Sequence, residues 1–203
     1  NSKKASSGIN AACTSVQEEN HVHDQLEMFA ADTLKSGDGY SDEKLVETLV
    51  YESRDAWKFL SDLGVDLTVV SQTGGHSAAR THRAQQKNRD IITTIGVDII
   101  KELSAYVGSC FPIISVSSSS RVTQLLKGNK GILNGVVYEK NKKQYQVECD
   151  AVILATGGFC GQTGNDSLLA QWRPDLVSLS TTNGNCADGD GINLACALGA
   201  QVV

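Results

Sequence analysis

The hydrophobic positions in the first half of the chain recur at helical spacing. Apolar side chains follow Asp24 at intervals of three and four residues, and they predict a helix with Asp24 as its N-cap and Gly37 at its end. A second helix is predicted from Ser41 to Gly64, because a serine and two acids stand at its start and a glycine stops the pattern. We expect its buried face to consist of Leu45, Leu49, Ala56, Phe59, Leu60 and Leu63.

The rest of this half alternates short apolar runs with polar stretches. Residues 65–70 predict a short strand, and residues 71–90 show no period. A third helix is predicted from Ile91 to Tyr106, and the apolar run from Phe111 to Val116 predicts another strand. Helices and strands therefore mix along the chain, as is typical of the α/β class.

The period then changes from 3.6 to 2. Residues 121–126, 132–138 and 144–149 are three short strand candidates, joined by polar turns at 128–131 and 141–143. Tight polar turns between β-rich runs predict an antiparallel meander.

A continuous apolar run from Ala151 to Ala155 follows the meander and stops at Gly157 and Gly158. Such a run is typical of a strand buried on both faces of a parallel sheet. Helical patterns return over 166–172 and 191–198. We therefore expect an α/β fold whose parallel sheet includes Ala151 to Ala155, with the meander set against it.

Composition narrows the function classes. The chain has 203 residues, of which 40% are hydrophobic, and this predicts one globular domain or slightly more. No apolar run approaches the roughly 20 residues of a membrane helix. The 18 basic and 23 acidic residues give a net charge of −5, which argues against nucleic acid as the main ligand.

The six cysteines, at positions 13, 110, 149, 160, 186 and 196, show no spacing typical of a metal site or a redox pair. Several stand within apolar patterns, as Cys149 and Cys196 do. This indicates reduced, hydrophobic cysteines in an intracellular protein, and we expect no bound metal.

The first candidate for ligand chemistry is the Thr156-Gly157-Gly158 turn after the predicted buried strand. Ligands bind at the carboxyl ends of strands in open α/β sheets. Glycine lets backbone N–H groups approach such a ligand closely. The same residues also suit an ordinary strand-to-loop turn, so the motif alone leaves both interpretations open.

A second candidate is Gly189-Asp190-Gly191, which follows Thr181-Thr182-Asn183 and opens a predicted helix. Asp190 would accept N–H groups either from a cofactor or from its own helix, and a plain capped helix start is the alternative. Asp188 and Asp190 do not make a calcium loop, because the further oxygen ligands and the terminal Glu are absent.

Two polar loops offer groups that could bind an anion. Residues 74–83 combine two glycines with two histidines and two arginines, although a solvated basic loop has the same composition. Residues 2–10 place serines and a glycine ahead of a predicted helix, which suits phosphate or ring contacts through backbone N–H groups, although any surface loop has a similar composition. The chain contains neither the GxSxG motif of a serine nucleophile nor the GxGxxG dinucleotide fingerprint.

Taken together and in this order, these motifs resemble the flavoproteins of the fumarate reductase and succinate dehydrogenase family. Within the family, the resemblance is greatest to the soluble NADH-dependent enzymes of trypanosomatid protozoa. The matching stretches are residues 1–10, 63–68, 71–77, 80–84, 150–159, 181–184, 189–191 and 198–203. The resemblance implies an FAD/NAD(P)-binding, Rossmann-like fold with FAD as cofactor.

The resemblance also implies the residues that meet the cofactor. The segment that wraps the flavin and its phosphates falls on Asn1, Ser2, Lys4, Ala5, Ser6, Ser7, Gly8 and Ile9. The remaining matched positions are Val122, whose backbone would meet the adenine, the turn of Ala155, Thr156 and Gly157, and the flavin-contacting acid Asp190. In this family the flavin N5 delivers a hydride to fumarate and an arginine delivers the proton.

For the substrate, the resemblance implies only nearby positions, in the turn of Thr73, Gly74, Gly75 and His76. The family's GxGxxG unit would precede Asn1, and its His-Pro-Thr motif and proton-donating arginine would follow Val203. We therefore expect residues 1–203 to be part of an FAD-binding domain, with no catalytic residue and no activity alone. A small dicarboxylate, fumarate or succinate, is the implied substrate.

Two departures from the family pattern favour other interpretations. Asp188 stands where the family has a threonine, and we expect its charge beside Asp190 to weaken flavin binding. The loop after His82 is shorter than in relatives. Alternatives are therefore an aspartate oxidase, a ketosteroid dehydrogenase or a non-catalytic paralogue. The electron donor stays open, because NADH, haem and iron–sulfur partners all occur in relatives. The compartment, whether mitochondrion, glycosome or cytosol, also stays open.

Overall fold

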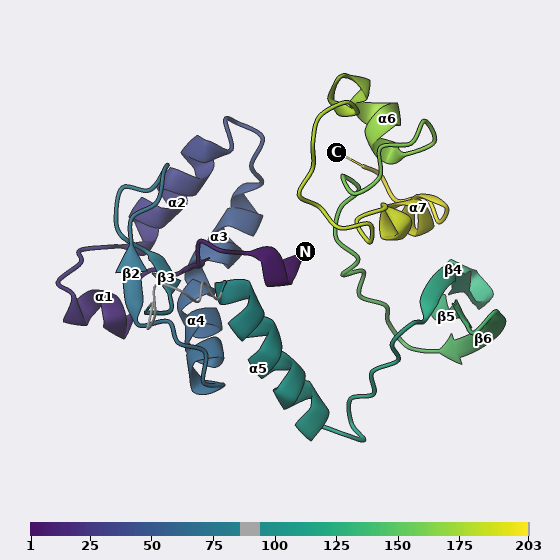
Figure 1. The fold of residues 1–203 in the computed structure, drawn as a ribbon, viewed down its shortest axis with the longest axis horizontal. Coiled ribbons are helices and arrows are strands. Elements are labelled where there is room, and N and C mark those ends of the chain that lie inside the picture. The colour runs from purple at the N-terminus through teal and green to yellow at the C-terminus, as the bar shows by residue number, and fades with distance from the viewer. Residues whose placement is uncertain (86–93, 203) are drawn as a thin grey trace. The chain divides into compact units, whose positions relative to one another are not determined.

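The computed structural model describes residues 1–85 and 94–202, and the chain divides into two compact units (Figure 1). The first unit is formed by Ser2–Ile114, and the second by Ser115–Val203 together with Asn1. Each unit has its own three-stranded antiparallel sheet. The two units are described separately below.

The first unit surrounds a small sheet with helices. Its elements are η1 (Ser2–Lys4), β1 (Ile9–Asn10), α1 (Ser15–Glu19), α2 (Leu26–Ser36), α3 (Glu43–Tyr51), α4 (Ser53–Asp62), β2 (Val69–Ser71), β3 (Thr81–Arg83) and α5 (Ile95–Ser109). The sheet has the order β1-β3-β2, and His82 pairs with Ile9 on one side and with Val70 on the other. Of the third predicted helix, residues 91–93 lie outside the described part of the chain, and the remainder is confirmed as α5.

The helix starts follow ordinary capping chemistry. Thr14 and Gln17 form a complete capping box at α1, and the Asp42 carboxylate accepts the Leu45 N–H at α3. The prediction that Asp24 caps α2 was wrong. Gln25 holds the N-cap position, and the Asp24 carboxylate is instead bound to the buried Arg80 guanidinium.

The segment predicted as the second helix forms two helices. Glu52 separates them, as the C-cap of α3 and the N-cap of α4. Of the predicted buried face only Leu60 is buried, and the rest of the face was placed wrongly. Leu45 is 71% exposed, and Leu49 and Phe59 are exposed as well. Val46, Val50 and Trp57, each one position after a predicted residue, are buried instead, together with Ser53.

Adjacent apolar pairs explain this error. Leu45 precedes Val46 and Leu49 precedes Val50, so the sequence carries two apolar stripes about 100° apart on one helix. The structure packs the valines against Ala12 and Phe29. A second cluster joins α1, α4 and α5 through Ala11, Val16, Trp57, Leu60, Val65, Leu67 and Ile95.

The second unit contains the predicted meander. Its elements are β4 (Arg121–Lys127), η2 (Asn129–Gly131), β5 (Leu133–Lys140), β6 (Lys143–Glu148), α6 (Leu168–Trp172), η3 (Pro174–Leu176) and α7 (Asp190–Cys196). The strand order β4-β5-β6 is antiparallel throughout, as the period of 2 predicted. The hairpin between β5 and β6 turns at Asn141 and Lys142, which both have positive φ. The two later helix predictions are confirmed as α6 and α7.

The strand predicted over Ala151 to Ala155 is not a strand in the structure. Ile153 is 90% exposed, and no described residue pairs with this segment in a ladder. A strand exists only where a neighbour completes its hydrogen bonds, so an apolar run without a partner stays irregular. The apolar pattern of residues 151–155 is therefore compatible with a buried strand, but it does not show whether a partner strand is present.

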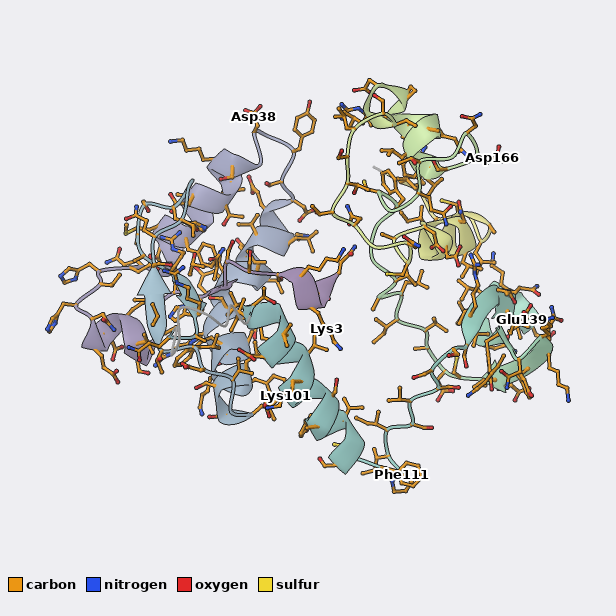
Figure 2. The ribbon with its side chains drawn as sticks, in the orientation of Figure 1. Lys3, Asp38, Lys101, Phe111, Glu139 and Asp166 are labelled. Atoms are coloured by element: carbon orange, nitrogen blue, oxygen red, sulfur yellow. The ribbon has the colours of Figure 1, made fainter. Side chains whose placement is uncertain are left out.

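The strand predicted over Phe111 to Val116 is likewise absent. The Ile114 N–H donates to Cys110 O, which closes a turn, and Pro112 has no N–H to offer a ladder. Phe111 and Ile113 are exposed, and Figure 2 shows Phe111 beyond the end of α5.

Two further observations bear on the sequence predictions. None of the helices in the described ranges is long and apolar enough to cross a membrane. All six cysteines are free thiols.

Candidate functional site

In the second unit, the Thr156–Gly158 turn lies against the start of α7. The Gly189 N–H donates to Gly158 O at 3.3 Å, and the Gly161 N–H donates to Ala187 O at 2.8 Å. Gly191 approaches Thr156 so closely that a Cβ would collide with the threonine side chain. The structure therefore brings the two predicted glycine motifs together.

Open space adjoins this turn. A cavity of about 380 Å³ is lined by Leu154, Thr156, Gly157, Gly191, Ile192, Ala195, Cys196, Ala200, Gln201 and Val202. Gly157 has a φ of 78°, and a Cβ at Gly157 or Gly158 would meet no atom within 4 Å. The glycine backbone is thus bare and accessible, which fits a turn that receives part of a large cofactor.

Arg121 binds the acid of the Gly-Asp-Gly motif. Its Nε donates to Asp190 Oδ2 and its Nη2 to Asp190 Oδ1, both at 2.7 Å. Asp188 lies 3.4 Å from the same guanidinium and also accepts the Asp190 backbone N–H. Arg121 therefore faces both carboxylates and offsets part of the charge that Asp188 adds beside Asp190.

Asn1 joins the Thr181–Gly184 motif. Its Nδ2 donates to Asn183 Oδ1 at 2.8 Å, and its Oδ1 accepts the Gly184 N–H at 2.7 Å. Val122 follows Arg121 in β4 and pairs with Tyr138 of β5. Of the predicted cofactor positions, Asn1 therefore contacts the Thr181–Gly184 motif, and Val122 lies in the meander.

In the first unit, the segment from Ser2 to Ala5 is held by the start of α5. The Gly96 N–H donates to Ala5 O at 2.9 Å, and the Thr94 hydroxyl donates to Lys3 O at 2.7 Å. A Cβ at Gly96 would collide with the backbone of Ser2 and Ala5, so only glycine permits this contact. Ser6 and Ser7 are exposed, and Gly8 lies against the backbone of β3.

A cavity of about 530 Å³ unites the predicted cofactor segment with the predicted substrate turn. Its lining consists of Gly8, Ile9, Asn10, Phe29, Asp32, Thr33, Ser36, Leu49, Ser53, Ala56, Gly75 and His76. A neighbouring cavity of about 430 Å³ shares Asp32, Ser36, Gly75 and His76, and adds Lys35 and Ser77. Thr73 and Gly74 line neither cavity, and the Thr73 hydroxyl is hydrogen-bonded to Thr81 instead.

His76 has polar partners on both ring nitrogens. Arg80 Nη1 lies 3.4 Å from its Nδ1, and Asn10 Nδ2 lies 3.3 Å from its Nε2. A guanidinium and an amide NH2 group both only donate, so each ring nitrogen of His76 faces a donor. The Nε2 edge of the ring is the one beside Asn10 and the predicted cofactor segment.

The prediction that the 74–83 loop binds an anion through its arginines and histidines was wrong for Arg80 and His82. The Arg80 side chain is fully buried and forms ion pairs of 2.7 Å with Asp24 and Asp32. It also lies over the Phe29 ring, with 4.7 Å from Cζ to the centroid. Its charge is thus already compensated inside the protein.

His82 is buried as a neutral side chain. Its Nδ1 lies 2.9 Å from Arg80 O, which only accepts, so Nδ1 carries the proton. Its Nε2 then accepts from the Thr14 hydroxyl at 2.8 Å. Burial is the main cause that lowers the pKa of His82, in agreement with this neutral arrangement.

The sequence predictions missed four polar residues at these sites: Asn10, Asp24, Asp32 and Arg121. No local spacing marks them, since Arg80 and Asp24 are 56 positions apart. One general signal was available in Arg80, which follows two glycines in its loop. A buried arginine requires carboxylate partners, so this residue could have prompted a search for Asp or Glu elsewhere in the chain.

The sequence was compared with known protein families. The chain belongs to the FAD binding domain family, whose profile matches residues 1–203, and its cofactor is FAD. Its relatives place it among the flavoproteins of the fumarate reductase and succinate dehydrogenase type.

Three relatives illustrate the likeness. Fumarate reductase 1 of Saccharomyces cerevisiae is 34% identical over 209 residues, covering 100% of this chain and 43% of the yeast protein. L-aspartate oxidase of Caulobacter vibrioides is 30% identical, covering 88% of this chain and 32% of that protein. A solved flavocytochrome c3 fumarate reductase in its open conformation superposes with a TM-score of 0.91 at 30% identity.

That structural match covers 99% of this chain and 34% of the solved chain. The α/β FAD-binding fold class is therefore confirmed. The chain spans less than half the length of the curated relatives it matches.

Proposed function

We propose that the chain forms part of the FAD-binding domain of an oxidoreductase that reduces fumarate to succinate. The observation that carries the proposal is the cavity of about 530 Å³ in the first unit. Gly8 and Ile9, matched to the flavin segment, line it together with Gly75 and His76, matched to the substrate turn. A flavin and a small dicarboxylate must lie in contact for hydride transfer, and one shared cavity meets that requirement.

The proposed cofactor contacts are those implied by the resemblance. In the second unit they are Asn1, Val122, Ala155, Thr156, Gly157 and Asp190, and in the first unit Ser2, Lys4, Ala5, Ser6, Ser7, Gly8 and Ile9. FAD supplies the hydride chemistry when bound. The bare backbone at Gly157 would approach the cofactor, while Arg121 keeps Asp190 oriented and offsets its charge.

On the substrate side, Gly75 and His76 would form one wall. The imidazole edge of His76 would lie beside a carboxylate oxygen, and the adjacent glycine would let the ligand approach the backbone. We assign no proton donor within these residues. The proton-donating arginine and the remaining carboxylate-binding groups are proposed to belong to other parts of the intact enzyme.

The test uses the intact protein. Purified protein should show flavin absorbance and should oxidise a reduced viologen dye when fumarate is added, with succinate as the product. L-aspartate and a 3-ketosteroid serve as rival substrates, and NADH replaces the dye to test it as the donor. A colourless protein would support a non-catalytic paralogue, and turnover of aspartate or the steroid in place of fumarate would overturn the proposal.

A further inference from the structure

One carboxylate oxygen in the first unit accepts three hydrogen bonds. Asp32 Oδ2, near the end of α2, accepts the Ser77 N–H at 2.7 Å, the Ser77 hydroxyl at 2.8 Å and Arg80 Nη1 at 2.7 Å. The Asp32 side chain is only 15% exposed. These bonds tie α2 to the residue that follows His76.

Arg80 gives this carboxylate a fixed partner. Its Nε and Nη2 bind the two oxygens of Asp24 at 3.0 and 2.7 Å, and its side chain has no exposed surface. One buried cation therefore faces two carboxylates. The Ser77 N–H and O–H groups offset the remaining negative charge on Asp32, and with Arg80 they hold its pKa below the ordinary value.

The turn that Asp32 holds has little regular structure of its own. Within it, the His76 N–H donates weakly to Thr73 O at 3.3 Å, and Gln72 Nε2 donates to His76 O at 2.6 Å. Gly75 adopts a φ of 84° between these bonds. The backbone of the turn is therefore held by side-chain anchors at Gln72 and at Asp32, and the His76 ring itself lies beside Arg80 and Asn10.

Asp24 and Asp32 share Arg80 but differ in one respect. Asp32 contacts the turn and lines the two cavities described above, whereas Asp24 contacts Arg80 and Gln17 and lines neither of them. Removing either carboxylate leaves Arg80 short of a partner. Only the loss of Asp32 also releases the turn.

We propose that Asp32 is a positioning residue, which holds the Gly75–Ser77 turn against α2 and thereby sets the affinity of the cavity for a dicarboxylate. This inference rests on the proposed function. Asp32 acts through Ser77 on His76 and does not itself bind the substrate, since its negative charge would repel a carboxylate. A shift of about 1 Å in the turn would move the His76 ring out of line with the dicarboxylate.

The experiment compares Asp32→Asn with Asp24→Asn in the intact, flavin-loaded protein. Succinate is titrated while the flavin absorbance is followed, and thermal unfolding is recorded in parallel. Both substitutions should lower the melting temperature, because each leaves Arg80 with one charged partner fewer. Only Asp32→Asn should also weaken succinate binding, by about tenfold, and raise the KM for fumarate with little change in kcat.

Ser77→Ala is the milder variant, which removes one donor to Asp32 and no buried charge. We expect about threefold weaker succinate binding at nearly unchanged melting temperature. Equal losses of affinity in the Asp32 and Asp24 variants, or unchanged affinity in the Asp32 and Ser77 variants, would overturn the positioning role alone. A wild-type protein with no flavin response to succinate or fumarate would overturn the proposed function as well.

Discussion

Arg121 and Asp190 form a two-bond ion pair that joins the first residue of β4 to the first residue of α7. Both bonds measure 2.7 Å, and hydrogen bonding to Asp190 is the main cause that raises the pKa of Arg121. The arginine is 65% exposed, so solvent limits what the pair adds to stability. Its main consequence is to fix the direction and charge of an acid beside the Thr156–Gly158 turn.

Replacing Arg121 should therefore affect FAD affinity more than stability. In Arg121→Leu, the uncompensated charges of Asp188 and Asp190 should raise the FAD dissociation constant about two- to fivefold, the range of an exposed ion pair. The measurement is a titration of the apoprotein by flavin fluorescence. Adding Asp188→Asn should restore part of the affinity, because it removes one of the two charges.

The matched control is Arg173→Leu, because Arg173 forms a similar exposed two-bond pair with Asp175 in the same unit. This control should bind FAD like the wild type. An equal loss of affinity in both variants would show that Arg121 acts only as one of many surface charges.

Gly157 gives a second test of the proposed cofactor turn. Its φ of 78° favours glycine or asparagine, and a side chain there would meet no protein atom within 4 Å. Gly157→Asn should therefore keep the backbone while placing a side chain where the cofactor is expected, and FAD affinity should fall at least about tenfold. Flavin absorbance per mole of purified protein measures the effect.

Gly64→Asn is the corresponding control, since Gly64 also has positive φ and open space around it but follows α4. Both variants should unfold at similar urea concentrations. Undiminished FAD in Gly157→Asn would remove this turn from the cofactor site.

Local patterns predicted the meander well, because a period of 2 and polar turns act within a few residues. They did not determine which face of α3 is buried, since Leu45 and Val46 are both apolar and only packing against Phe29 decides between them. They also could not show that Ala151 to Ala155 lacks a ladder partner, because pairing depends on residues distant in sequence.

In the candidate site, too, local motifs could be predicted from the sequence, whereas contacts between distant residues could not. The glycine turns were predictable, since glycine motifs signal close backbone approach. Arg80 was predictable as a loop cation but not as a buried one. Its partners Asp24 and Asp32 come from a different part of the chain, and only the fold brings the three together.

The corrected face of α3 leads to a stability prediction. Val50 has no exposed surface, so Val50→Ala should lower the free energy of unfolding by about 1.5–3 kcal/mol. Leu45→Ala, on the exposed stripe, should change it by less than about 0.5 kcal/mol. Urea unfolding of both variants measures the difference. A larger effect at Leu45 would mean that the originally expected face is the buried one.

His82 predicts how stability depends on pH. Burial lowers its pKa below the ordinary 6.5 and keeps it neutral, whereas the unfolded chain protonates it near pH 6.5. Below that pH the unfolded state binds more protons than the folded state. The free energy of unfolding should therefore fall as the pH decreases from about 6.5, by at most about 1.4 kcal/mol per pH unit.

His82→Asn separates this titration from the hydrogen bonds. The asparagine amide should still donate to Arg80 O, as the Nδ1–H of His82 does, but it loses the bond with Thr14. We expect the variant to be about 1–3 kcal/mol less stable at pH 7, with a flatter profile between about pH 6.5 and 5. His23→Asn, at an exposed histidine, should keep the wild-type slope. Urea unfolding across this range decides the matter, because equal slopes in the wild type and in His82→Asn would mean that another group causes the loss of stability.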